Sequence, residues 1–207
     1  MSIQDIHFFI FDSLADWEAA YAIAGINTPQ FQRKPGNFRV RTVATQLKPV
    51  TTAGGIRIQP DLTLNDLSET DCSMLILPGG GLWDEGKNME VIETAKTVLA
   101  SGAVVAAICG ATVGLARGGL LDDRKHTSNA RQYLEATLYK GGALYQDKPA
   151  VTDGPVITAA ATAPIDFAFQ IFRYLELYSP EVLAAWYGLF KTGKPEYFAA
   201  LMQAAKS

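Results

Sequence analysis

The sequence predicts an α/β fold in which a mainly parallel sheet is covered by helices on both faces. Residues 6–11, 73–77 and 103–108 form short, almost continuously apolar segments, as expected of strands in the middle of a parallel sheet. These segments alternate along the chain with longer patterns of helical period. Such alternation is typical of parallel strands joined by crossover helices.

The composition favours one globular domain spanning residues 1–207. Of the 207 residues, 48% are hydrophobic and 19% are charged, which is typical of a chain that buries a core. The net charge is −3 without a basic cluster, which argues against a nucleic-acid partner, and no apolar run is long enough to span a membrane. Two cysteines and no signal-peptide pattern fit a reducing, cytoplasmic location.

The first strand is expected at residues 6–11. Ser13 and Asp16 have the S-x-x-D spacing of a capping box, so a helix should begin there and run to about Gly25. After a loop, residues 38–44 alternate between apolar and polar side chains, which indicates a more exposed strand.

A hairpin and a second strand–helix unit follow. The hairpin is expected within residues 49–61, turning at Gly54-Gly55, and a short acidic helix or turn within 64–69. The strand at 73–77 ends in Pro78-Gly79-Gly80-Gly81, and an amphipathic helix at 88–101 is closed by Gly102.

The central strand, residues 103–108, passes into a helix at 110–117 with no loop residue except Cys109. A corner this sharp strains the backbone of its central residue and leaves room only for small neighbours, here Ala107, Gly110 and Ala111. We therefore expect Cys109 to occupy a nucleophile elbow. The N–H groups of the following helix point at the sulfur, which favours the thiolate.

The second half is expected to add smaller strands and several helices. The expected elements are a short strand at 126–127, a helix capped by Ser128 or Asn129 and ending at Leu138, strands at 143–151 and 156–159, a helix from Pro164 to about Tyr178, and a C-terminal pair of helices beginning at Ser179 and near Pro195.

Parallel sheets bind ligands at the carboxyl ends of their strands, so we looked there for companions of Cys109. Glu18 has apolar neighbours at helical spacing; it either points inward, with a raised pKa, or lies exposed while Trp17 points inward. Asp16 either caps its helix or faces the same cleft. Cys72 lacks the context of an elbow and is interpreted as structural.

The remaining candidates are a glycine run and a histidine. Gly79, Gly80 and Gly81 could place backbone N–H groups beside that of Gly110 as an oxyanion hole, or form only a turn. His126 could reach Cys109 as a base or be a structural residue. His7, at the start of the first strand, is interpreted as structural.

The combination of these segments resembles the DJ-1/PfpI family of the class I glutamine amidotransferase-like superfamily. The resemblance rests on residues 106–111, on 75–81, on Asp16-Trp17-Glu18 and on the hairpin at 50–61, and it covers roughly residues 3–177. Within this family, the sequence most resembles the subgroup described as intracellular proteases or amidases.

The resemblance implies a flavodoxin-like three-layer sandwich with Cys109 as the elbow thiol and Glu18 hydrogen-bonded to it. It further implies oxyanion N–H groups from Gly80 and Gly110, a nearby histidine at His126, a homodimer, and no organic cofactor or metal. Family members with peptidase-like or glyoxalase-like chemistry usually place histidine directly after the cysteine, where this chain has Gly110. Glutamine amidotransferases carry a late His-x-Glu pair, and residues 161–166 contain no histidine.

Three functions are therefore considered. The first is a cysteine-dependent small-molecule enzyme, amidase-, hydrolase- or hydratase-like, in which Cys109 attacks and Glu18, with or without Asp16, transfers the proton. The second is a non-catalytic redox or stress protein that senses oxidation at Cys109. The third is an amidotransferase-like subunit or interaction module. The apolar C-terminal extension, residues 179–207, is expected to pack on the core or on a dimer partner.

Overall fold

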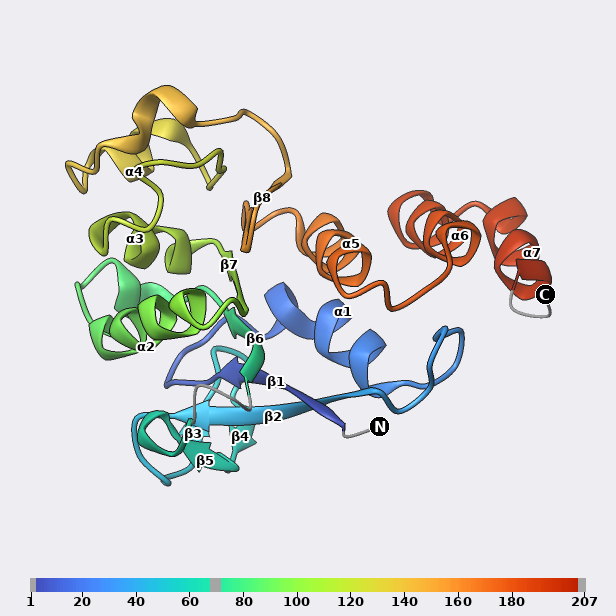
Figure 1. The fold of residues 1–207 in the computed structure, drawn as a ribbon, viewed down its shortest axis with the longest axis horizontal. Helices are drawn as coiled ribbons and strands as arrows, with labels where there is room; N and C mark the ends of the chain where they lie inside the picture. The colour runs from blue at the N-terminus through green and yellow to red at the C-terminus, as the bar shows by residue number, and fades with distance from the viewer. Residues whose placement is uncertain (1–2, 68–71, 205–207) are drawn as a thin grey trace.

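The computed structural model describes residues 3–67 and 72–204, and these form a sheet between two layers of helices (Figure 1). The seven strands are ordered β5-β2-β1-β6-β7-β9-β8, and only β8 and β9 pair antiparallel. The sheet is therefore mainly parallel, as the sequence predicts. Its strands are β1 (Gln4–Phe9), β2 (Phe38–Ala44), β5 (Leu62–Thr63), β6 (Cys72–Leu77), β7 (Val104–Ile108), β8 (Ala150–Asp153) and β9 (Val156–Ala159).

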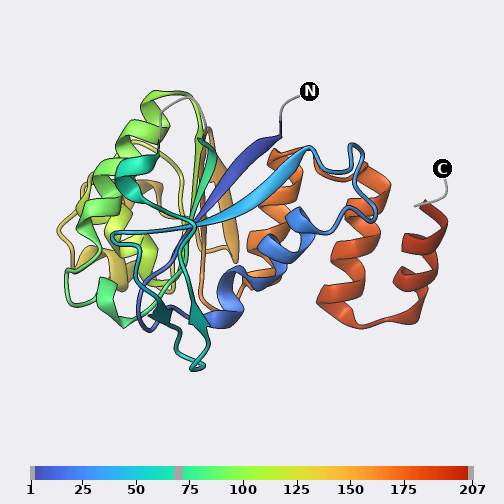
Figure 2. The same cartoon turned by 90° about the horizontal axis from the view of Figure 1, so that it is seen from below.

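Helices cover both faces of this sheet (Figure 2). Helices α2 (Met89–Ala100) and α3 (Gly110–Arg117) pack on one face, against β6 and β7, and α1 (Asp16–Asn27) and α5 (Pro164–Tyr174) pack on the other. The central strands are buried on both sides because their side chains are apolar in both directions, as in residues 104–108. No helix in the described part of the chain is long and apolar enough to cross a membrane.

The hairpin is confirmed as β3 (Val50–Thr51) paired antiparallel with β4 (Arg57–Ile58). Gly55 has a φ of 82°, which explains why a glycine stands at the turn. A 3-10 turn, η1 (Leu64–Asp66), follows; residues 68 and 69 of the expected acidic turn lie outside the described residues.

The predicted capping box at Ser13 and Asp16 is wrong. Helix α1 begins at Asp16 itself with Ala15 as its N-cap, and Ser13 lies in a left-handed conformation with a φ of 64°. The reason is tertiary: the Ser13 N–H donates to Thr51 O of the hairpin at 2.7 Å, which pulls this segment away from the helix axis. Strand β1 also begins and ends earlier than expected.

Two further boundaries differ in the second half. The expected helix after Asn129 is the short α4 (Arg131–Glu135), capped by Ala130, and the first part of the expected strand at 143–151 is a 3-10 turn, η3 (Gly141–Leu144). Helix α5 ends at Tyr174 because Glu176 takes a left-handed φ of 48°.

The C-terminal helices extend one helical layer outward (Figure 2). Helix α6 (Pro180–Thr192) packs on α5, and α7 (Pro195–Ala204) packs on α6. Trp186 of α6 contacts Phe172 of α5 with ring centroids 4.9 Å apart, and Lys191 pairs with the buried Asp166 at 2.6 Å. The extension therefore packs on its own chain through α6.

Candidate active site

The site is built around the corner between β7 and α3. Cys109 is the one residue between them, with a φ of 59° and a ψ of −126°. Gly110 leaves room for close packing here, since a Cβ on it would lie 3.1 Å from Gly80 O. The half-buried thiol thus sits at the carboxyl end of a central strand, where the N-terminus of α3 begins.

Glu18 points inward from α1 to this corner. Its side chain is buried, with 2% exposure, while Trp17 is 60% exposed, so the first of the two predicted orientations is confirmed. Its Oε2 accepts a hydrogen bond from Gly79 N at 2.5 Å, and its carboxyl lies beside the Cys109 thiol and raises the pKa of that thiol.

Gly79 fills the narrow space between the carboxyl and the thiol. A Cβ on Gly79 would lie 2.5 Å from Glu18 Oε2 and 2.9 Å from Cys109 Sγ, so only glycine fits. Because its N–H donates to Glu18, Gly79 holds the carboxyl in place and does not serve as the predicted oxyanion donor.

Gly80 and Gly110 are the other two glycines of the predicted oxyanion hole. Gly80 has a φ of 154°, and a Cβ there would lie 2.8 Å from the Phe11 ring. Within residues 3–67 and 72–204 the Gly80 N–H makes no hydrogen bond, and the backbone N–H of Gly110 lowers the pKa of the Cys109 thiol.

Sequence reasoning missed a functional contact of Asn129. Its Nδ2 donates to Cys109 Sγ at 3.4 Å, and its Oδ1 accepts from Ala161 N at 2.8 Å. Asn129 was expected only as a possible helix cap. Its place at the carboxyl end of the sheet was the sole sequence signal, because the contact is made to a residue 20 positions away.

His126 does not act at the thiol in this structure. It is fully buried, with Nδ1 hydrogen-bonded to Arg124 O at 2.8 Å and Nε2 to Tyr139 Oη at 2.9 Å. Burial lowers the pKa of the imidazole, which favours the neutral ring. The expectation of a base is therefore replaced by a structural role: both ring nitrogens already have other partners.

Asp16 faces the hairpin instead of the thiol. Its Oδ2 accepts from Gly54 N at 2.7 Å, and its hydrogen bond with Thr52 lowers the pKa of the carboxyl. The expected part in proton transfer is not supported by these contacts. Asp16 instead fastens the hairpin beside the start of α1.

The electrostatics of the pair correct the expectation of a resting thiolate. Burial raises the pKa of the Cys109 thiol to about 11, and the neighbouring Glu18 carboxylate adds to this, while the Asn129 amide opposes it. Burial also raises the pKa of Glu18 above its ordinary range. The pair is therefore a neutral thiol beside a buried carboxyl of raised pKa, two groups between which a proton can pass.

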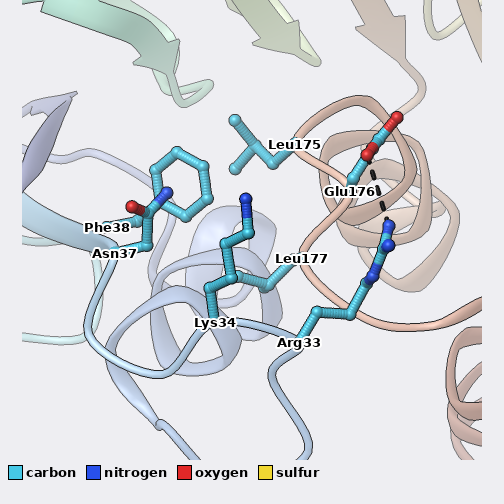
Figure 3. A pocket seen from close by; sticks show the side chains of 7 residues that line it. All are labelled: Arg33, Lys34, Asn37, Phe38, Leu175, Glu176 and Leu177. Atoms are coloured by element: carbon cyan, nitrogen blue, oxygen red, sulfur yellow. Dashed lines mark hydrogen bonds and ion pairs between the residues drawn. The ribbon is translucent and has the colours of Figure 1, made fainter. Parts of the chain in front are cut away.

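Other features of the described chain lie away from this pair. No three His, Cys, Asp or Glu side chains there come together as a metal-binding group. Figure 3 shows a small pocket of about 100 Å³ whose Arg33 pairs with Glu176 at 3.2 Å. Its residues precede β2, begin it at Phe38, or follow α5, so the pocket lies at the amino edge of the sheet, opposite Cys109.

Comparison with known proteins agrees with this architecture. The model of the DJ-1/PfpI family matches residues 4–174. The chain belongs to the DJ-1/PfpI family. Among its relatives, the "Uncharacterized protease YoaZ" of Bacillus subtilis is 38% identical over 98% of both chains, and "Uncharacterized protease YdeA" of the same organism is 32% identical over 84% of both.

The fold is shared with solved structures of the DJ-1/PfpI family. A thiJ/pfpI family protein from Bacillus anthracis superposes with a TM-score of 0.90, at 38% identity over 99% of both chains. More distant relatives carry named activities: the "Glutathione-independent glyoxalase DJR-1.2" of Caenorhabditis elegans, 29% identical over 68% of this chain and 75% of its own, and the "Isonitrile hydratase" of Pseudomonas putida, 29% identical over 67% and 60%.

Proposed function

We propose that this protein is a cysteine-dependent enzyme that hydrates or hydrolyses a small molecule at an electrophilic carbon. The observation that carries the proposal is the buried Glu18 carboxyl held by Gly79 N–H against the Cys109 thiol. A buried carboxyl beside a neutral thiol is, in its ionised form, a base placed at a nucleophile. The names of the relatives that are a glyoxalase and an isonitrile hydratase support a small substrate of this kind.

The first step joins the sulfur to the substrate. As Cys109 Sγ forms a bond to a carbonyl carbon, the S–H proton passes to the Glu18 carboxylate and the π electron pair moves onto the carbonyl oxygen. We assign the stabilisation of that oxygen to the backbone N–H groups of Gly80 and Gly110, which follow β6 and β7 at the carboxyl edge of the sheet. The thiol thus loses its proton at the same time as its sulfur bonds to carbon, so no thiolate has to form beforehand. A resting thiol with a pKa of about 11 is therefore compatible with reaction.

Water completes the reaction. For an amide, the amine leaves with the proton held by Glu18, and Glu18 then accepts a proton from the water that attacks the resulting thioester. Return of that proton to the departing sulfur restores the thiol and the carboxylate. Glu18 alone can serve as base in each step, since one histidine, His126, is engaged elsewhere and the other, His7, lies buried in β1.

The test is turnover of a panel of isonitriles, α-dicarbonyls and simple amides by the intact chain. We expect activity on at least one class that is lost in Cys109→Ser and strongly reduced in Glu18→Gln. Activity that survives Cys109→Ser would refute the proposal. Inactivity of the wild-type chain on all three classes would refute the substrate assignment.

The redox alternative has one observation in its favour: the half-buried sulfur accepts a hydrogen bond from Asn129, a donor that would also stabilise an oxidised form. The raised pKa of the thiol counts against it, because peroxide reacts with the thiolate. Mass spectrometry after mild peroxide separates the two: selective gain of two oxygen atoms at Cys109 supports sensing. A homodimer and a cytoplasmic location remain predictions.

A further inference from the structure

We propose that Asn129 is a catalytic residue of this site, whose carboxamide N–H holds the Cys109 sulfur in position and stabilises the negative charge that develops on it. This inference rests on the proposed function, in which Cys109 is the nucleophile. It assigns to Asn129 the second polar side chain at the sulfur, beside that of Glu18, in a chain whose His126 is engaged elsewhere.

The orientation of the carboxamide is fixed by its other end. Oδ1 accepts from Ala161 N at 2.8 Å, in the turn between β9 and α5, so the amide nitrogen must face the sulfur at 3.4 Å. Exchange of the two atoms would set an NH₂ group against the Ala161 N–H, two donors without an acceptor. The backbone of the turn between β9 and α5 therefore aims a side-chain donor at the corner between β7 and α3.

The loop that carries Asn129 is anchored both to α3 and to β9. Ser128 Oγ lies 2.6 Å from Thr112 Oγ1 in α3, and Thr112 in turn donates to Cys109 O at 2.6 Å. The Thr127 N–H donates to Thr158 Oγ1 of β9 at 2.9 Å. These buried contacts tie the loop to the same elbow whose sulfur Asn129 touches, which keeps the donor pre-aligned.

The chemistry suits a carboxamide. An amide N–H can donate to a thiolate, but it cannot take the proton, so Asn129 lowers the cost of the charge without competing with Glu18 for the proton. Besides Asn129, the groups that act on the pKa of the Cys109 thiol are the Glu18 carboxyl from α1 and the Gly110 N–H from α3. Of these, only the Gly110 N–H shares with Asn129 the effect of favouring the charged sulfur.

The test is a pH titration of the thiol itself, followed by thiolate absorbance in a Cys72→Ser background so that Cys109 is the one cysteine. Asn129→Ala should raise the apparent pKa of Cys109, and Asn129→Asp should raise it further because a carboxylate then faces the sulfur. Alkylation of Cys109 by iodoacetamide at pH 8 should slow by about tenfold in Asn129→Ala. Asn27→Ala is the matched control: Asn27 also accepts from a backbone N–H, that of Val40, but at the far end of α1.

The sign of the shift separates the proposed role from a structural one. If Asn129 only holds the Ala161 turn, its loss admits water to a thiol whose pKa burial has raised, and that pKa falls. A fall or no change in Asn129→Ala overturns the inference. Because the titration needs no substrate, failure of the turnover assays refutes the proposed function without altering this result.

Discussion

The two cysteines of this chain differ in their neighbours far more than in their acidity. Cys72 opens β6, is 5% exposed, and has a pKa raised to about 12 by burial. Cys109 closes β7 and has a pKa raised to about 11, also chiefly by burial. Each sulfur has a carboxyl that raises the pKa of the thiol and a backbone N–H that lowers it, Asp5 and Met74 for Cys72, Glu18 and Gly110 for Cys109. Asp5, however, pairs with Arg39 at 2.8 Å, whereas Glu18 is buried, and Cys109 also accepts from the Asn129 side chain. The comparison teaches that a buried carboxyl and a side-chain amide donor, and not a low thiol pKa, distinguish the position of Cys109.

We expect the largest effect on turnover when the Cys109 sulfur is replaced, and almost none when the Cys72 sulfur is replaced. Cys109→Ser should abolish turnover, by at least about a thousandfold, and eliminate labelling by iodoacetamide at the elbow. Cys72→Ser should leave both nearly unchanged, because that side chain lies within a strand, away from the site. Peptide mapping after labelling checks the pair, and equal labelling of both cysteines in the wild-type chain would contradict the comparison.

Removing the base should have the next largest effect. Glu18→Gln keeps the acceptor for the Gly79 N–H but cannot take up the thiol proton, so kcat should fall by about a hundredfold to a thousandfold. Asp16→Asn is the control on the same helix, and it should change kcat by less than about threefold because Asp16 faces the hairpin. Comparable losses in the two variants would remove the special role of Glu18.

The close packing of Gly79 between the Glu18 carboxyl and the Cys109 thiol predicts a smaller effect, which is seen in the free energy of unfolding. Gly79→Ala places a methyl group 2.5 Å from Glu18 Oε2 and 2.6 Å from Cys109 Cβ, so it should cost about 1–3 kcal/mol in the free energy of unfolding and separate the pair. Gly81→Ala has nothing within 4 Å of the new methyl group and should be near neutral. Chemical denaturation of both variants measures the difference.

The smallest expected effect is the pH dependence of stability contributed by Glu18. Its pKa is higher in the folded than in the unfolded chain, so the unfolded chain loses this proton at lower pH. Ionisation of Glu18 therefore reduces stability as the pH rises from the unfolded pKa to the folded one. Glu18→Gln should gain in stability relative to the wild-type chain across that interval, as measured by denaturation from pH 4 to pH 7, and a gain toward lower pH would contradict the raised pKa.

Much of the fold follows from local patterns. The apolar run 104–108 must be a buried strand, and the small residues around Cys109 permit the direct turn into α3 that the structure shows. Glycines at 54 and 55 predict the hairpin turn, and Ser179 before Pro180 predicts the start of α6, where its side chain accepts from Val182 N. These features depend on sterics and hydrogen bonds within a few residues, which one sequence specifies.

The sequence by itself therefore determined the strand–helix corner, the position of Cys109 on it, and Glu18 as a candidate companion. Only the tertiary structure decided that Glu18 points inward, that Asn129 reaches the sulfur, and that His126 does not. The physical reason is range: the Glu18–Gly79 contact spans 61 positions and the Asn129–Cys109 contact spans 20. The protonation state of the Cys109 thiol is also decided only by the tertiary structure. Burial raises the pKa of this thiol, and burial is a property of the assembled layers and not of any one segment.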